Sequence, residues 1–327
     1  MDIDAFFEPW EGTSVESFDD FNERLNRLYK RWVETDKRRF AWRGVTNASW
    51  PLHSSLYRRL AWTTGSIPDE TDLLNAETET LKRVHQWGLH NGGRGRLSIL
   101  SQLATLQHFD APTRLIDVTL NAYIGLWFAV QQELTSGIPE EQVVDGRLFA
   151  IDITKRLINE KSPPDVANRR DADRDWEDER HRPWKDPDAD WQKIWCSHTW
   201  AWRPPPFEAR IAAQNGAFLF GGVPSTGMGV RWPKDSSATA KNWKQEEVRS
   251  AVSIPLRFHK ADPLAGGVPT AHGQPAYIFR IKGDAKPEIR DRLRALFGYE
   301  HSTIYPDFPG FATYAGPHLA RLPPPDA

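Results

Sequence analysis

The sequence predicts a single-domain α+β protein with a helix-rich first half and an antiparallel or mixed sheet. Segments with helical periodicity dominate up to about residue 133, and segments with strand-like alternation dominate from residue 146 onward. Helices and strands that are segregated along the chain favour an α+β fold over a doubly wound α/β fold. The chain has 327 residues, which is long enough to bury one large core.

The composition predicts a cytoplasmic protein whose core contains many aromatic rings. Only 39% of the residues are apolar, but 15 are tryptophan, so large rings must fill much of the interior. The 42 Lys and Arg residues nearly balance the 44 Asp and Glu residues, which excludes a global field that attracts nucleic acid or membranes. One cysteine, Cys196, favours a reducing compartment. The acidic N-terminus does not resemble a signal peptide, and no stretch is long enough to cross a bilayer.

The first helix is expected over residues 17–33, because apolar residues recur three and four positions apart and Ser17 is a suitable N-cap. A short strand is predicted over 40–44, followed by a turn over 45–49. A second helix over 70–87 begins with acidic residues and ends near Gly88.

The central elements are a buried helix over 97–107, a brief extended stretch over 113–117 and a helix over 121–133. The last of these is apolar nearly all round, which indicates a central position. Strands are predicted over 146–153 and 217–220 and within 251–260 and 276–283. A short helix over 287–297 has proline at its start and Gly298 past its end.

Residues 161–206 are a dense mixture of charges, prolines and tryptophans with few aliphatic side chains. Such a segment cannot build a core of its own, so it is predicted to be an excursion or a lid. Its tryptophans are expected to dock on the main body or on a partner, because many exposed rings would promote aggregation. They are Trp176, Trp184, Trp191, Trp195, Trp200 and Trp202.

Three groups of polar residues lie beside apolar segments. The first is Arg43-Gly44, where a guanidinium at the end of a strand suits a pyrophosphate or a carboxylate. The alternative is a structural arginine that pairs with an acid such as Asp117. The third group, which follows the second along the chain, is Arg210 and Gln214. These two residues lie on one helical face before a turn and in isolation indicate only a solvated face.

The second group lies between two helices that are predicted to be buried. Buried polar side chains either satisfy one another or line a cavity, and the sequence leaves both possibilities open. A histidine with Arg and Asp nearby can serve as a base or as a neutral donor that orients a ligand. The members are Gln107, His108, Asp110, Thr113, Arg114, Asp117, Thr119 and Asn121.

These groups occur in the order found in the FRG domain, a family named for a Phe-Arg-Gly motif. The motif stands here as Trp42-Arg43-Gly44, and LQHFDAPTRLIDVTLNAYIGLWFA resembles the central signature of the family. RPPPFEARIAAQNGAF is similar to its Arg…Gln-x-Gly-x-Phe block, and STIYPDFPGFA to its ending. The resemblance runs from about Phe40 to Gly310. It implies an FRG domain over residues 37–320, containing the excursion, after an N-terminal helical extension over 1–36.

The FRG family in turn resembles ADP-ribosyltransferases, which implies an ADP-ribosyltransferase-like core and NAD as a substrate, with no metal. Under this analogy the catalytic residues are Arg43, His108 and Asp307, with Glu300 as the alternative late acid. The NAD-binding residues are Arg43, Gly44, Thr113, Arg114, Asp117 and Gln214. The Ser-Thr-Ser triplet and the late Glu-x-Glu pair of those transferases are absent from the sequence.

The implied function is an NAD-dependent toxin or effector in anti-phage defence or a toxin–antitoxin system. It would modify a nucleic acid or a protein, and an antitoxin or operon partner would accompany it. One alternative is a non-catalytic module that senses a nucleotide or binds a partner. A metal-dependent nuclease is disfavoured because the sequence has no compact set of Asp, Glu and His ligands.

Overall fold

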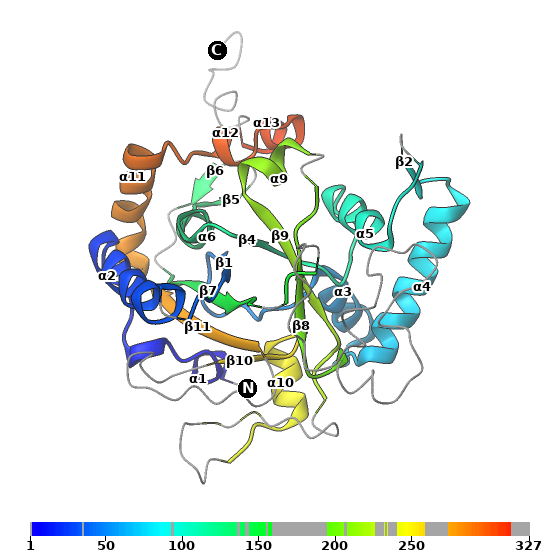
Figure 1. Ribbon diagram of the computed structural model, residues 1–327, viewed down its shortest axis with the longest axis horizontal. Helices are drawn as coiled ribbons and strands as arrows, with labels where there is room; N and C mark the ends of the chain where they lie inside the picture. The colour runs from blue at the N-terminus through cyan, green and yellow to red at the C-terminus, as the bar shows by residue number, and fades with distance from the viewer. Residues whose placement is uncertain are drawn as a thin grey trace, which may run out of the picture.

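The computed structural model describes residues 2–34, 36–92, 95–135, 138–140, 144–154, 156–158, 195–205, 208–225, 232, 234, 241–258 and 274–314. Its centre is a seven-stranded mixed sheet in the order β10-β11-β7-β1-β4-β9-β8. Neighbouring strands are antiparallel except β10 and β11, which are parallel. Helices cover both faces of the sheet (Figure 1), which confirms the predicted single-domain α+β fold.

The strands of this sheet are β1 (Phe40–Val45), β4 (Ile116–Thr119), β7 (Gly146–Asp152), β8 (Thr199–Trp202), β9 (Gly216–Gly221), β10 (Leu256–Phe258) and β11 (Gln274–Ile281). Two small hairpins pair β2 (Asn91–Gly92) with β3 (Gly95–Arg96), and β5 (Glu133–Thr135) with β6 (Ile138–Glu140). The helices are α1 (Ile3–Phe6), α2 (Phe18–Leu28), α3 (Ser55–Thr64), α4 (Glu70–Gln86), α5 (Ile99–His108), α6 (Ala122–Val130), α9 (Ala209–Ala213), α10 (Gln245–Ala251), α11 (Lys286–Phe297), α12 (His301–Ile304) and α13 (Phe308–Tyr314).

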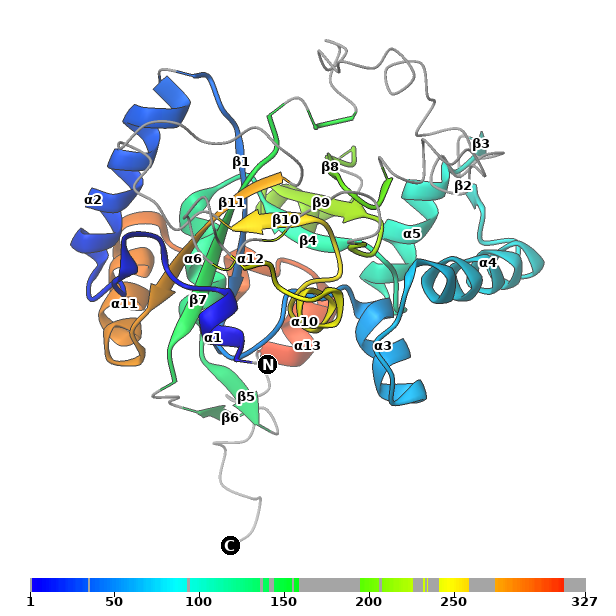
Figure 2. The ribbon, with the colours of Figure 1, turned by 90° about the horizontal axis from the view of Figure 1, so that it is seen from below.

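Side chains alternate along each strand between the two faces of the sheet. In β7, Leu148 and Ala150 pack into a core with α2, α6 and α11, whereas Phe149 and Ile151 pack into a core with α1 and α10. A third core joins α5 to β8 and β9. Figure 2 shows α3, α4 and α5 on one side of the molecule, away from α2 and α11. No helix among the described residues is long and apolar enough to span a membrane.

Most predicted elements are confirmed within a few residues. Ser17 caps α2 by accepting the Asp20 N–H at 3.1 Å, and Gly298 ends α11 with a φ of 65°. The helix predicted over 121–133 ends at Val130, because the chain turns into β5 at Glu133. In the segment 251–260, the first residue still belongs to α10 and only Leu256–Phe258 is a strand.

The predicted excursion over 161–206 lies mostly outside the described residues, together with Trp176, Trp184 and Trp191. Its last part belongs to the main body: β8 is the edge strand next to β9. The tryptophans there dock on the core, as predicted, since Trp195, Trp200 and Trp202 are buried. The predicted N-terminal extension also belongs to the folded unit, because its aromatic side chains are buried in two of the cores.

Helix α6 crosses β1 and β7 with its backbone almost against theirs. A Cβ on Gly44 would overlap the carbonyl oxygen of Gly125, and a Cβ on Gly146 would overlap the carbonyl oxygen of Ala129. A Cβ on Gly125 would lie 2.7 Å from the Cβ of Trp42. The glycine of the Trp-Arg-Gly motif therefore has a packing role, as a residue without a side chain under a crossing helix.

Gly44→Ala is expected to lower the free energy of unfolding by about 2–4 kcal/mol, because the new methyl group meets backbone atoms that cannot yield. Denaturant unfolding followed by circular dichroism measures this change. Gly216→Ala is the matched control, since the nearest atom to its Cβ would be 3.4 Å away, and its stability should change by less than about 0.5 kcal/mol. Equal stability of both variants would contradict the packing role of Gly44.

Candidate functional site

The sheet splits between β1 and β4. The two strands pair only at Trp42 and Thr119, although continued pairing would place Asp117 opposite Gly44. The side chain of Arg43 spans the gap instead: its Nη1 donates to the backbone oxygen of Asp117 at 2.8 Å and lies 3.6 Å from the carboxylate of that residue. The pairing of Arg43 with Asp117, one of the two alternatives left open by the sequence, is therefore present.

A cleft of about 730 Å³ opens at this split. The cleft is lined by the segment from Trp50 to Arg58, which ends in the first turn of α3, and by the end of α5, by α9 and by Tyr305. Nine of the polar-group residues that the sequence singled out line this cleft: Arg43, Gly44, Gln107, His108, Asp110, Asp117, Thr119, Arg210 and Gln214.

The guanidinium groups of Arg43 and Arg58 both lie near the carboxylate of Asp117 in the cleft, but only Arg43 is paired with it. The Nε atom of Arg43 is buried and has no hydrogen-bond partner among the described residues. The guanidinium of Arg58 is exposed at the cleft and makes no hydrogen bond or ion pair with the described residues. Loss of hydration, followed by the charge of Arg43, lowers the pKa of Arg58, and Asp117 only partly offsets this. The centre of the cleft therefore carries excess positive charge and an unused donor.

The far wall carries a second set of charges. Arg210 lies 5.0 Å from the ring centroid of Tyr305 and holds both carboxylate oxygens of Asp307 at 2.8 Å. His108 Nε2 lies 3.8 Å from a carboxylate oxygen of Glu208, and the side chain of His108 is largely buried. His108 and Arg58 therefore line the same cleft, which contains both signs of charge.

Residues 38–137 match the model of the FRG domain family. This segment of the chain resembles the FRG domain family. The match contains Arg43, His108 and Asp117, whereas Arg210, Gln214 and Asp307 lie beyond it. Comparison with curated proteins and with solved structures gave no match.

Two residues of the FRG signature, Thr113 and Arg114, do not line the cleft, contrary to the expectation that they contact the cofactor. Both are buried. The hydroxyl of Thr113 donates to the side-chain oxygen of Gln107, so these two groups satisfy each other. The signature thus supplies Gln107, His108, Asp110, Asp117 and Thr119 to the cleft, whereas Thr113 and Arg114 are buried outside its lining.

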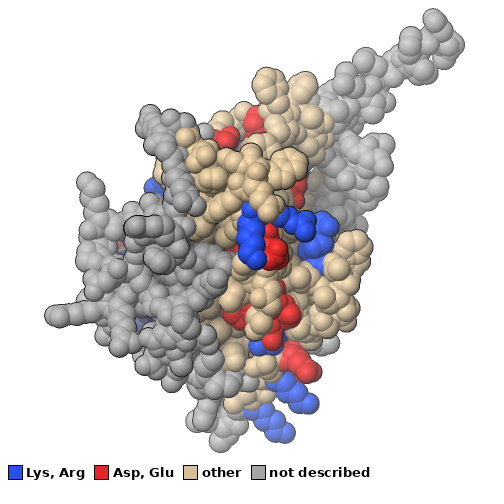
Figure 3. All heavy atoms as spheres, turned by 90° about the vertical axis from the view of Figure 1, so that its right-hand side faces the viewer, with Lys and Arg blue, Asp and Glu red and all other residues tan. Residues whose placement is uncertain are grey.

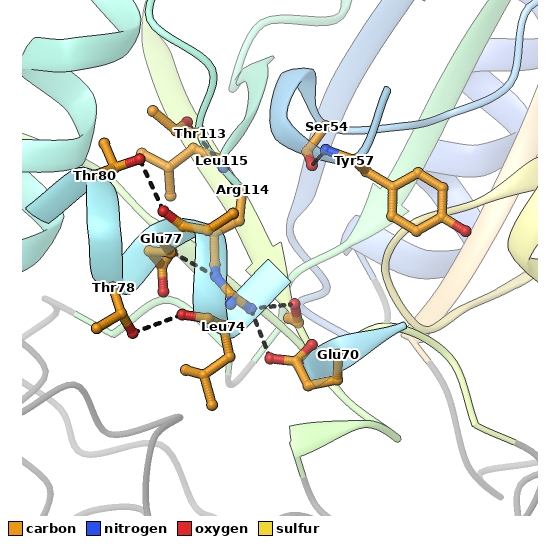
Figure 4. Close-up of polar contacts among 12 residues, drawn as sticks. Ser54, Tyr57, Glu70, Leu74, Glu77, Thr78, Thr80, Thr113, Arg114 and Leu115 are labelled. Carbon is orange, nitrogen blue, oxygen red and sulfur yellow. Dashed lines mark hydrogen bonds and ion pairs between the residues drawn. The ribbon is translucent and has the colours of Figure 1, made fainter. Parts of the chain in front are cut away.

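Arg114 joins α4 to the sheet through a buried ion network (Figure 4). Its Nε lies 2.7 Å from Glu77 and its Nη1 lies 3.1 Å from Glu70. Burial alone would lower the pKa of Arg114, but the carboxylates of Glu70 and Glu77 outweigh it and raise the pKa. The side chain of Glu70 also accepts from the Trp195 indole at 2.9 Å. Arg114 is therefore committed to the packing of α4.

Asp307 and Glu300, the two candidates for the catalytic acid near the end of the chain, also lie outside the lining of the cleft. Asp307 sits behind Arg210 and accepts the Gly310 N–H at 2.7 Å, and the hydrogen bonds from Arg210 hold its pKa below the usual range. Glu300 and Asp307 line a neighbouring cavity of about 1200 Å³, which shares Tyr305 with the cleft. Gln214 donates to the Ile304 backbone oxygen at 3.1 Å and so ties α9 to α12.

Residues 50–58 were not among the candidates from the sequence, yet Trp50, His53 and Arg58 all line the cleft. The available signal was the mixture of aromatic and basic side chains around the capped start of α3 at Ser54. Tyr305 was missed because only the fold brings it to Arg43.

Other chemistries find little support in the part of the chain that the structure describes. It contains no group of three His, Cys, Asp or Glu side chains that could hold a metal ion. Cys196 is buried, and burial raises the pKa of its thiol to about 12, so it is a poor nucleophile. On the face in Figure 3, basic and acidic side chains lie next to one another.

Arg114→Ala is expected to lower the free energy of unfolding by about 3–5 kcal/mol, because it leaves buried carboxylates without their cation. Arg43→Ala should cost less than about 1 kcal/mol, since Arg43 and Asp117 are partly exposed. Chemical denaturation of both variants measures the difference. Loss of the fold in Arg43→Ala, or full stability of Arg114→Ala, would contradict the distinction between the two arginines.

His53 is expected to make the protein sensitive to acid. Burial, assisted by the charge of Arg58, lowers the pKa of His53 from 6.5 to about 4. Between these values the unfolded chain binds the proton and the folded chain does not, so stability is full above pH 6.5 and falls toward pH 4. The loss between pH 7 and 4 should be smaller in His53→Gln by about 2–3 kcal/mol. Urea unfolding at several pH values measures it, and parallel curves for the two proteins would contradict it.

Proposed function

We propose that the cleft binds NAD and that the protein is an ADP-ribosyltransferase-like enzyme. The observation that carries this proposal is the buried Arg43 Nε without a partner, beside the exposed Arg58 and with Asp117 as their shared carboxylate. A pyrophosphate carries two negative charges and several acceptor oxygens, so it complements two guanidinium groups better than a single carboxylate does.

The size and lining of the cleft support a dinucleotide. A volume of about 730 Å³ lies within the range of cofactor and small-molecule sites. The lining combines aromatic rings, among them Trp50, Phe128 and Tyr305, with a few polar groups that converge at the split. With the pyrophosphate on Arg43, one half of NAD extends toward Trp50 and the other toward His108.

In ADP-ribosyl transfer the bond between the ribose C1′ and the nicotinamide nitrogen breaks, and nicotinamide leaves with the electron pair. The ribose carbon becomes positive, an acceptor oxygen or nitrogen bonds to it, and the acceptor loses a proton. We assign His108 as the base for that proton, since it lines the same cleft as Arg43 and Arg58. Asp307 would act through Arg210, which it holds at the cleft, and so would be a positioning residue.

The biological setting follows from the FRG family rather than from the geometry. We propose a cytoplasmic toxin or effector of anti-phage defence or of a toxin–antitoxin system. Its acceptor would be a nucleic acid or a protein, and an antitoxin or operon partner would restrain it.

A second candidate function is a non-catalytic module that senses a nucleotide. It is favoured by the position of the late acids, since neither Asp307 nor Glu300 lines the cleft. Transferases need a carboxylate that stabilises the positive ribose, and Asp307 is neutralised by Arg210. Under this function the cleft binds NAD or a related nucleotide without turnover.

The test uses the purified chain, NAD labelled in its adenylate half, and cell extract. Transfer of label to a protein or nucleic acid is expected, together with release of nicotinamide. Arg43→Ala should bind NAD at least about tenfold more weakly, because a hydrogen bond to a charged group contributes about 1.5–3 kcal/mol.

Arg59→Ala is the matched control, since Arg59 is next to Arg58 on α3 but packs on Trp62 and does not line the cleft. It should bind and react like the natural chain. Binding without transfer would favour the sensor, and no NAD binding by folded protein would remove both candidates.

A further inference from the structure

The segment from Trp50 to Arg58 lines the cleft and presents an exposed ring. The Trp50 side chain is 44% exposed although it lines a cleft. A turn fixes its backbone: the Trp50 N–H donates to the Asn47 carbonyl at 3.1 Å, and Asn47 Oδ1 accepts the Ser49 N–H at 2.9 Å. An indole held at a cleft by a structured turn is a platform on which a flat ligand can stack.

The tautomer of His53 is set by its surroundings. Its Nε2 lies 2.9 Å from the backbone oxygen of Arg249. A carbonyl oxygen can only accept, so Nε2 carries the proton. Since burial lowers the pKa of His53 to about 4, the ring is neutral near pH 7 and its Nδ1 is an acceptor. Nδ1 makes no hydrogen bond with the described residues, and His53 lines the cleft.

Electrostatic interactions link His53 to the charged residues of the cleft. His53 is close enough to Arg58 for the charge of Arg58 to lower its pKa, and Arg58 interacts in turn with Arg43 and Asp117. A ring platform, a neutral acceptor and a cation thus line the same cleft. These are the groups that bind the base and the phosphate of a nucleotide.

We propose that Trp50 and His53 form an adenine subsite: the indole stacks on the base, and His53 Nδ1 accepts a hydrogen bond from the exocyclic amino group. Arg58 binds the phosphate of the adenylate. The inference rests on the proposed function, because it assigns the adenylate half of NAD to Trp50, His53 and Arg58. AMP alone, however, can occupy the subsite and test it separately.

The acceptor on His53 selects among purines. Adenine presents an amino group, whereas hypoxanthine presents a carbonyl oxygen at the same position, and two acceptors cannot bond. A polar group left unpaired in a partly buried site costs about 1–3 kcal/mol, which corresponds to about 5- to 150-fold in affinity. AMP should therefore bind at least about fivefold more tightly than IMP.

Calorimetric titration of AMP and IMP into the full chain tests this subsite. In His53→Phe the preference for AMP should fall to near unity. This variant leaves the Arg249 carbonyl paired, because the Tyr57 hydroxyl also donates to it at 2.9 Å. Trp50→Ala should weaken AMP and IMP alike by about tenfold and keep their ratio, since stacking on an aromatic ring contributes about 1–3 kcal/mol per base. Trp62→Ala is the matched control, because Trp62 is exposed on α3 and does not line the cleft.

The outcomes separate the subsite from the proposed function. Equal binding of AMP and IMP by the natural chain, which needs no variant to fold, would overturn the role of His53. Unchanged binding by Trp50→Ala would overturn the platform. Selective AMP binding without NAD turnover would leave the subsite standing while the transferase fails, and NAD turnover without AMP selectivity would do the reverse. Failure to bind AMP, IMP or NAD would overturn both.

Discussion

The contact between α6 and the β1–β7 pair sets the geometry of the central sheet. Gly44, Gly125 and Gly146 leave no side chain between the helix and the strands, so the backbones meet directly. Because side chains alternate along a strand, Trp42 and Gly44 face α6 and Arg43 faces the other way. The Trp-Arg-Gly motif therefore has three distinct roles: a buried ring, a cleft arginine and a gap for a helix.

The same constraint explains why Arg43 and Arg114 differ although both stand in polar signature segments. Arg114 is enclosed by Glu70 and Glu77, so its charge is fully compensated inside the protein. Arg43 has only Asp117, whose side chain is more than half exposed. An internally satisfied charge contributes to stability, whereas an incompletely satisfied charge in a cleft is available to a ligand.

Local pattern was sufficient to predict much of the fold. The regular spacing in α2, the proline and glycine at the ends of α11 and the alternation in β7 specify their own elements. The edge strand β8 was hidden, because its tryptophans stand in a region of mixed charge and alternate only with Thr199 and Ala201. The site was predictable in part: Arg43, His108 and Asp117 line the cleft, but Asp307 is bound by an arginine 97 residues earlier in the chain. Such long-range pairs leave no periodic signal in a single sequence.

The central claim is that the split between β1 and β4 is an anion-binding cleft centred on Arg43. A crystal of the full chain soaked with ADP-ribose tests it most directly, by difference density at the ligand. An anion-binding cleft at this split should hold the pyrophosphate, with an oxygen within hydrogen-bond distance of Arg43 Nε. ADP-ribose bound instead in the neighbouring cavity beside Tyr314, with Arg43 still bonded only to Asp117, would contradict it.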